Sequence, residues 1–242
     1  MSDALSDEEV EREAIAFAKA NKKAIARELT DKAVYPKEAD PVAVFMAGSP
    51  GAGKTEASKA LVEELTAGTE KKILRIDPDD LRCRFSACTG NNSYLFQGAV
   101  SILVDKVLDY AHDNRQSFLL DGTLAVYDLA YRNIKRCVDK KRKVQIYYVY
   151  LDPLQAWTFV QARELEEGRC IPVEHFVNQY FAARDVVNTL KSEFGNHLMV
   201  DLLIKPNDAG QKVFKAGIDK IDYHIPTEKY DRATLEKMLK TL

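Results

Sequence analysis

The sequence has little of several features that mark particular classes of protein. Its 242 residues include four cysteines, with no CxxC pair and no histidine at zinc-site spacing, so we expect reduced thiols instead of disulfides or a zinc centre. No apolar run approaches the ~20 residues of a membrane span, and the N-terminus is acidic, unlike a secretory signal. Lysine and arginine total 35 against 37 acidic residues, which gives no general attraction for nucleic acid. The basic clusters at Lys135-Arg136 and Lys140-Lys141-Arg142-Lys143 are most simply a solvated edge. We therefore expect a cytoplasmic protein with no membrane partner and no nucleic-acid partner.

What is present is an alternation of helical and strand patterns, which predicts an α/β three-layer sandwich around a mostly parallel sheet of five or six strands. With 46% hydrophobic residues, we expect one domain over 1–242, composed of an N-terminal helical extension (1–40), a core (41–205) and a C-terminal hairpin and helix (206–242). Strands are predicted at 42–47, 72–76, 117–120, 144–151, 198–204 and 212–215, the last after a turn at 207–210. Helices are predicted at 7–30, 53–65, 93–114, 153–167 and 172–194. A further helix is predicted to end at about residue 138, and a short one to begin at about residue 233.

The most specific motif is a Walker A loop directly after the strand 42–47. It comprises Gly48, Ser49, Pro50, Gly51, Ala52, Gly53, Lys54 and Thr55. Its glycines let backbone N–H groups and a helix N-terminus converge on the β-phosphate of a nucleoside triphosphate such as ATP. Lys54 would bridge the β- and γ-phosphates, and the Thr55 hydroxyl would ligate Mg²⁺. The alternative is a glycine-rich turn that binds nothing.

An acidic segment, Asp77-Pro78-Asp79-Asp80-Leu81-Arg82, follows the strand 72–76. At the carboxyl end of a parallel strand, a carboxylate can orient a substrate hydroxyl and accept its proton. Asp77 can instead cap the helix that begins at Pro78. We assign the cap to Asp77 and the chemistry to Asp79, with Asp80 as the alternative base. Arg82 is assigned to the substrate side.

Two further groups follow at predicted element ends. Asp121, after a short apolar strand, resembles a Walker B acid that would hold Mg²⁺; it could instead satisfy the turn at Gly122 and Thr123. Thr123 is assigned to substrate binding. Arg163 and Arg169 flank the end of a predicted helix, where a guanidinium could stabilise phosphoryl oxygens. Arg163 could equally pair with a glutamate on the helix surface.

Together these motifs resemble the zeta toxin family. The resemblance rests on the order of the Walker A loop, the D-x-D turn (Asp77, Asp79), the acid-Gly-Thr-Leu element from Asp121, and the segments after Arg163 and Arg169. It implies a P-loop kinase fold in which ATP phosphorylates the sugar 3-hydroxyl of UDP-N-acetylglucosamine. It also implies Asp79 as the base, Arg163 and Arg169 as γ-phosphate clamps, and a small helical antitoxin as partner.

Other functions stay open on the residues alone. The acceptor could be another UDP-sugar, another nucleotide, a small hydroxylated metabolite or a polynucleotide 5′-hydroxyl. A protein of a different class, a nucleotide-dependent switch or hydrolase with no acceptor, would usually carry a guanine-reading N-K-x-D or a glutamate directly after the Walker B acid. This chain has Gly122 at that position and no N-K-x-D after the Walker A loop.

Overall fold

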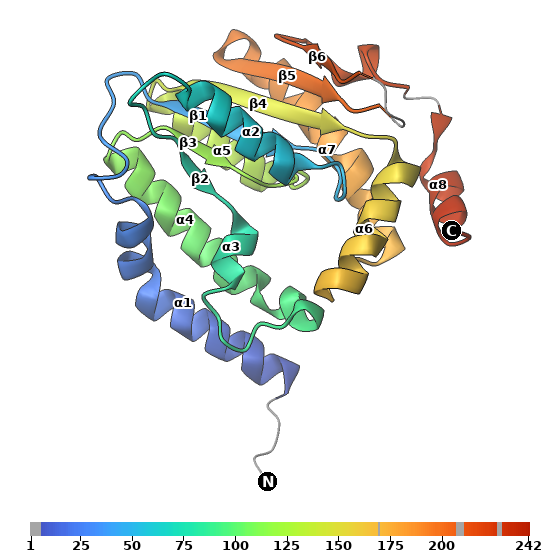
Figure 1. The fold of residues 1–242 in the computed structure, drawn as a ribbon, viewed down its shortest axis with the longest axis horizontal. Coiled ribbons are helices and arrows are strands. Elements are labelled where there is room, and N and C mark those ends of the chain that lie inside the picture. The colour runs from blue at the N-terminus through green and yellow to red at the C-terminus, as the bar shows by residue number, and fades with distance from the viewer. Residues whose placement is uncertain (1–5, 169, 207–210, 227–228) are drawn as a thin grey trace.

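The computed structural model describes residues 6–168, 170–206, 211–226 and 229–242 (Figure 1). Its sheet has six strands in the order β2-β3-β1-β4-β5-β6. The first five strands run parallel and β6 pairs antiparallel to β5. The strands are β1 (Val42–Ala47), β2 (Leu74–Ile76), β3 (Phe118–Leu120), β4 (Lys143–Tyr150), β5 (Leu198–Ile204) and β6 (Val213–Lys215). The predicted fold class is confirmed.

Helices cover both faces of this sheet. They are α1 (Asp7–Leu29), α2 (Lys54–Thr66), α3 (Pro78–Arg82), α4 (Gln97–Asp113), α5 (Tyr127–Asp139), α6 (Pro153–Glu167), α7 (Val173–Phe194) and α8 (Arg232–Leu239). In Figure 1, α2 lies on the face towards the viewer, and α5 and α7 lie on the far face. The main hydrophobic core fills the space between these layers, and β1 is buried from its second residue onward.

The N-terminal helix α1 packs along α4 and forms a second hydrophobic cluster with it (Figure 1). Its start is fixed by a capping box: Glu9 N donates to Ser6 Oγ at 3.3 Å, and Ser6 N donates to the Glu9 carboxylate at 2.9 Å. Small residues such as Ala14 and Ala18 face α4, which lets the two helices approach closely.

Two local expectations were wrong. The helix predicted from residue 93 begins later, because a 3-10 helix covers Gly90–Phe96 and α4 starts at Gln97. Asn92 has non-helical dihedral angles, and its side chain accepts a hydrogen bond from Thr89 N at 2.7 Å, a local bond that competes with α-helix formation. The basic stretch before β4 reads as a solvated edge, yet Arg142 in it is only 7% exposed. Its guanidinium donates to the carbonyls of Gln116 and Ala111 at 2.7 and 2.9 Å.

Three further expectations concern the turn at 207–210, membrane-spanning helices and the cysteines. The turn predicted at 207–210 lies outside the described residues, whereas the hairpin partner strand β6 is present. None of the helices within the described ranges is both long enough and apolar enough to span a bilayer. All four cysteines are free, and only Cys137 is buried.

Candidate active site

The Walker A loop connects β1 to α2 in a conformation that requires its glycines. Gly51 and Gly53 have φ angles of 72° and 77°, a region that side chains with a Cβ rarely adopt. A Cβ at Gly51 would also lie 2.1 Å from the Ala156 carbonyl oxygen of α6. The loop therefore rests directly on the first turns of α6, and its far side is tied down by a 3.2 Å hydrogen bond from Gly48 N to Thr123 O.

Lys54 lies at the centre of the predicted site. Its Nζ donates to the Ser49 carbonyl at 2.6 Å, across the loop. Burial lowers the pKa of Lys54 to about 8; the charges of Asp121 and Asp79 oppose this shift, and that of Arg163 adds to it. Asp79, Asp121 and Arg163 line the same cavity as Lys54, so the structure brings together four residues that the sequence predicted separately.

Asp77 and Asp121, at the tips of β2 and β3, share one arginine. Arg75 pairs with Asp77 and, at 2.7 Å, with Asp121; its Nε also donates to Ser58 Oγ at 3.0 Å. Ser58 Oγ in turn donates to Asp121 at 2.7 Å. Burial raises the pKa of Asp77, although Arg75 lowers it. The network holds the two strand tips in a fixed relation.

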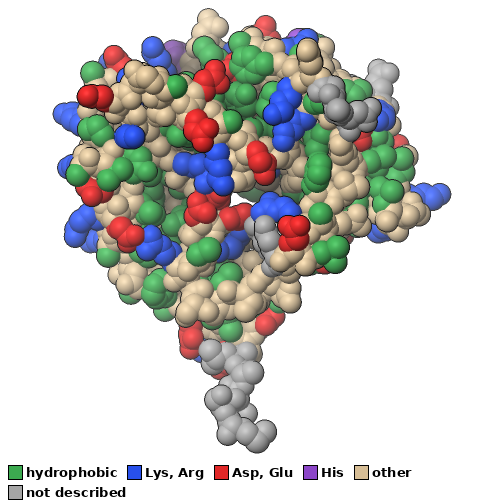
Figure 2. Space-filling model, viewed as in Figure 1, with side chains coloured by type: hydrophobic (Ala, Val, Ile, Leu, Met, Phe, Trp, Pro, Cys, Tyr) green, Lys and Arg blue, Asp and Glu red, His purple; other side chains and the backbone are tan. Residues whose placement is uncertain are grey.

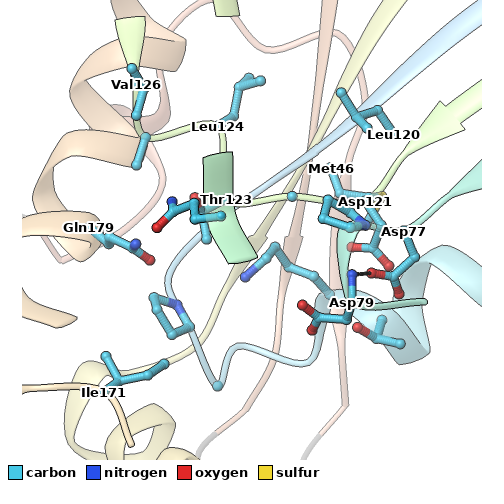
Figure 3. A pocket seen from close by; sticks show the side chains of 18 of the residues that line it. Met46, Asp77, Asp79, Leu120, Asp121, Thr123, Leu124, Val126, Ile171 and Gln179 are labelled. Carbon is cyan, nitrogen blue, oxygen red and sulfur yellow. Dashed lines mark hydrogen bonds between the residues drawn. The ribbon is translucent and has the colours of Figure 1, made fainter. Parts of the chain in front are cut away.

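The structure places the three aspartates of the acidic turn differently. Asp77 is the N-cap of α3 and accepts from Asp79 N at 2.8 Å. Asp79 lines the cavity, and its carboxylate pairs with Arg82 of the next helical turn. In Figure 3, the carboxylates of Asp77, Asp79 and Asp121 gather on one side of this cavity. The side chain of Asp80 is 75% exposed and reaches Arg75 instead.

The cavity is large, about 920 Å³, a volume typical of sites for whole small molecules. Figure 2 shows a hollow near the middle of the visible face, bordered by acidic and basic side chains. Arg163 of α6 and Thr123 of the loop after β3 line it, as does Arg82. Arg169 lies outside the described residues.

Sequence reasoning missed several residues here. Arg75 is one charged residue in an otherwise apolar strand, a signal that could have been read as a buried ion pair. Lys205 directly follows β5, lines the cavity and reaches the Gly53 carbonyl at 3.4 Å; its position at a strand tip was the available clue. Asp152, which caps α6, accepts bonds from Lys229 at 2.6 Å and from the Tyr230 hydroxyl at 3.1 Å. No sequence spacing indicates that last contact.

The donors for a metal ion are sparse but suitable for Mg²⁺. No group of three or more His, Cys, Asp or Glu side chains forms a metal cage within the described ranges. Mg²⁺ commonly binds through one or two protein oxygens together with phosphates and water. Thr55 and Asp121 both line the cavity; Asp121 uses Oδ2 for Arg75 and Ser58. Its Oδ1 accepts no hydrogen bond from the described residues, and this oxygen fits such a role.

A Walker A loop on the first strand of this sheet, with acids at the tips of the two neighbouring strands on one side, defines the P-loop kinase fold. The particular family follows from a family-model comparison: the zeta toxin model matches residues 25–219. The chain belongs to the zeta toxin family, as the resemblance implied.

Solved structures agree on the fold. A structure from the PezAT toxin–antitoxin system of Streptococcus pneumoniae is 16% identical with a TM-score of 0.63, covering 93% of this chain and 94% of that one. The AvrRxo1-ORF1:AvrRxo1-ORF2 complex with sulphate ions is 15% identical with a TM-score of 0.59, covering 92% and 73%. The complex with ATP is 16% identical with a TM-score of 0.56, covering 85% and 65%. Among curated proteins, no sequence matches this chain.

Proposed function

We propose that this protein is a toxin kinase that transfers the γ-phosphoryl group of ATP to a hydroxyl of a nucleotide sugar, with UDP-N-acetylglucosamine as the lead acceptor. The observation that carries the proposal is the shared cavity of Lys54 and Asp79. A phosphate-binding loop alone would serve hydrolysis or switching equally well. A carboxylate on the same cavity, oriented by Arg82, is what transfer to an alcohol requires.

In this proposal the chain's own residues divide the reaction between them. The loop N–H groups and Lys54 hold the β- and γ-phosphates. Asp79 accepts the proton of the acceptor hydroxyl. The oxygen of that hydroxyl forms the new bond to the γ-phosphorus, and the bond between this phosphorus and the leaving ADP oxygen breaks. Arg163, and Arg169 by resemblance, stabilise charge on the transferring phosphoryl oxygens. Thr55 and Asp121 would hold Mg²⁺, which supplies neutralising charge at the phosphates when bound.

The test is a mass-spectrometric screen of nucleotide sugars and nucleotides with ATP, using wild type, Asp79→Asn and the matched variant Asp80→Asn. We expect a phosphorylated product with wild type and with Asp80→Asn, and none with Asp79→Asn, which should still bind ATP in calorimetry. Loss of product in Asp80→Asn alone would move the base to Asp80. Hydrolysis of ATP by wild type without any phosphorylated acceptor would favour the switch or hydrolase instead.

A toxic activity and a protein partner of antitoxin type are part of the same proposal. They are supported by the family and by the PezAT structure, which comes from a toxin–antitoxin system. Expression of wild type in a bacterial host should slow growth, and Asp79→Asn should relieve that effect at equal protein level. Equal growth inhibition by both would separate any toxicity from phosphoryl transfer.

A further inference from the structure

The cavity continues well beyond the groups that face the phosphates, and its far end is different in character. Figure 3 shows Thr123, Leu124, Val126, Ile171 and Gln179 across the cavity from the three carboxylates. Val104 of α4 and Leu129 of α5 line it as well. An apolar wall with a few polar groups is typical of a site that binds the body of an organic ligand.

Charge is nearly absent from this end. On α4, α5 and the loop 122–126, the described lining residues carry two charged side chains, Asp105 and Arg132. These two pair with each other at 3.0 Å. On α7, His175 lines the cavity and its Nε2 lies 2.6 Å from Gln179 Nε2. The far end therefore suits an uncharged group more than a phosphate.

Asn133 stands out among the polar residues there. It is only 7% exposed and lines the cavity from α5, one helical turn after Leu129 and Ala130. Its carboxamide makes no hydrogen bond with any side chain or backbone group among the described residues. Its polar atoms are not among the sealed side-chain atoms that lack a partner, so they are open to the cavity, where water or a ligand can bond them.

Of the other described amides on the cavity wall, Asn178 and Gln179 have partners within the protein, and Gln97 is exposed, so water can satisfy its amide. Asn178 Oδ1 accepts from Arg232 at 2.9 Å, and Gln179 contacts His175. Asn133 is thus the buried wall amide left for a ligand in the part of the chain that the structure describes. A carboxamide presents one acceptor oxygen beside a donor NH₂ group, so its complement is a neutral edge with a donor next to an acceptor.

We propose that Asn133 determines acceptor specificity by binding an uncharged donor–acceptor edge of the acceptor. This inference rests on the proposed kinase function and names the kind of group the site reads. The edge of a uracil base has this chemistry in full, because its N3–H lies beside a carbonyl. The acetamido group of a sugar is a trans amide whose N–H and C=O point in opposite directions, so it can meet either the oxygen or the NH₂ of Asn133, one at a time. Both occur in UDP-N-acetylglucosamine, whereas UDP-glucose retains only the uracil, so the pair of compounds separates the two sources.

Asn133→Leu is the informative variant, because it keeps the branching and the number of side-chain heavy atoms and removes the hydrogen-bonding edge. We expect it to raise KM for UDP-N-acetylglucosamine about tenfold or more, since a site built to bond a polar group strongly rejects its mismatch, with kcat changed much less. An increase confined to UDP-N-acetylglucosamine assigns the acetamido group. An equal increase for UDP-glucose assigns the base. Unchanged KM values for both compounds would overturn the proposal.

Stability distinguishes ligand binding from a structural role. Because the Asn133 amide has no partner to lose, Asn133→Leu should not lower the melting temperature. The matched control is Asn188→Leu: Asn188 donates to Asp222 at 2.6 Å and accepts from Ile221 N at 2.9 Å, so its loss should lower the melting temperature clearly. A comparable drop in Asn133→Leu would make Asn133 a structural residue and overturn the proposal.

Failure of the proposed function gives a different result. If wild type phosphorylates neither compound, binding of each to the protein loaded with a non-hydrolysable ATP analogue is measured by calorimetry. Tighter binding to wild type than to Asn133→Leu would support the role of Asn133 in ligand binding, although the proposed phosphoryl transfer would be wrong. Equal binding to both proteins, or no binding of either compound to wild type, would overturn it.

Discussion

Replacing Arg75 tests whether the ionic network at the strand tips holds the site together. Arg75→Met would leave Asp77 and Asp121, which are 8% and 5% exposed, without the cation that pairs with both. Removing one partner of a buried ion pair costs about 3–5 kcal/mol, because the remaining charge is uncompensated. With a urea m-value of about 3 kcal/mol/M, the unfolding midpoint at pH 7 should fall by about 1–2 M.

The pH dependence of this loss has a definite sign. The pKa of Asp77 is already raised by burial, and Arg75 opposes that shift, so the variant should raise this pKa further. A carboxyl whose pKa is higher in the folded state takes up a proton more readily there, and its destabilising effect fades as the pH falls towards that pKa. The difference in unfolding free energy between wild type and Arg75→Met should therefore be smaller at pH 5 than at pH 7.

Two matched variants make the measurement decisive. Arg75→Lys keeps the charge but not the planar fork, so we expect it to recover part of the stability. Arg84→Ala removes an ion pair with Glu28 whose side chains are 36% and 59% exposed, and it should cost less than about 1 kcal/mol. If Arg75→Met costs no more than Arg84→Ala, or costs the same at both pH values, the network is not the constraint described above.

Two further predictions concern the loop itself. Gly51→Ala should abolish ATP binding in calorimetry, because its Cβ would meet the Ala156 carbonyl oxygen at 2.1 Å. The control Gly68→Ala, at a position with a similar φ of 66° and nothing within 4 Å of the added Cβ, should leave binding intact. If both variants have the same effect, the contact between the loop and α6 does not matter for ATP binding. Because the pKa of Lys54 is about 8, ATP should bind more weakly as the pH rises above 8. At pH 8.5, binding of ATP should be accompanied by uptake of protons by Lys54. In Lys54→Arg, whose side chain stays charged, ATP binding should cause no proton uptake. If the uptake equals that of wild type, the proton goes to a group other than residue 54.

Much of the fold can be predicted from local sequence patterns. β1 and β5 coincide with the predicted ranges, because apolar runs bounded by proline, glycine or polar residues leave little freedom in where a buried strand begins. The start of α4 was misplaced because Asn92 and Thr89 bond to each other locally. Such a choice depends on a few side-chain contacts that a helical pattern does not report.

The site divides in the same way. Lys54, Asp79 and Arg163 were predicted because each lies in a motif or at an element end. Arg75 and Asn133 were not, since their significance depends on what surrounds them in space: two carboxylates for Arg75, and no protein partner among the described residues for Asn133. Sequence position indicates where a side chain emerges, and only packing decides whether its polar atoms have partners.

The bond between Asp152 and Tyr230 bears on where this chain can be shortened. The family model ends at residue 219, but the groups that secure the start of α6, Lys229 and Tyr230, come later. A fragment trimmed to the family boundary would keep the Walker A loop and every motif described above. It would lose the anchor of the helix that supports Gly51 and carries Arg163, so we expect a fragment to need residues through Tyr230 to hold that helix in place.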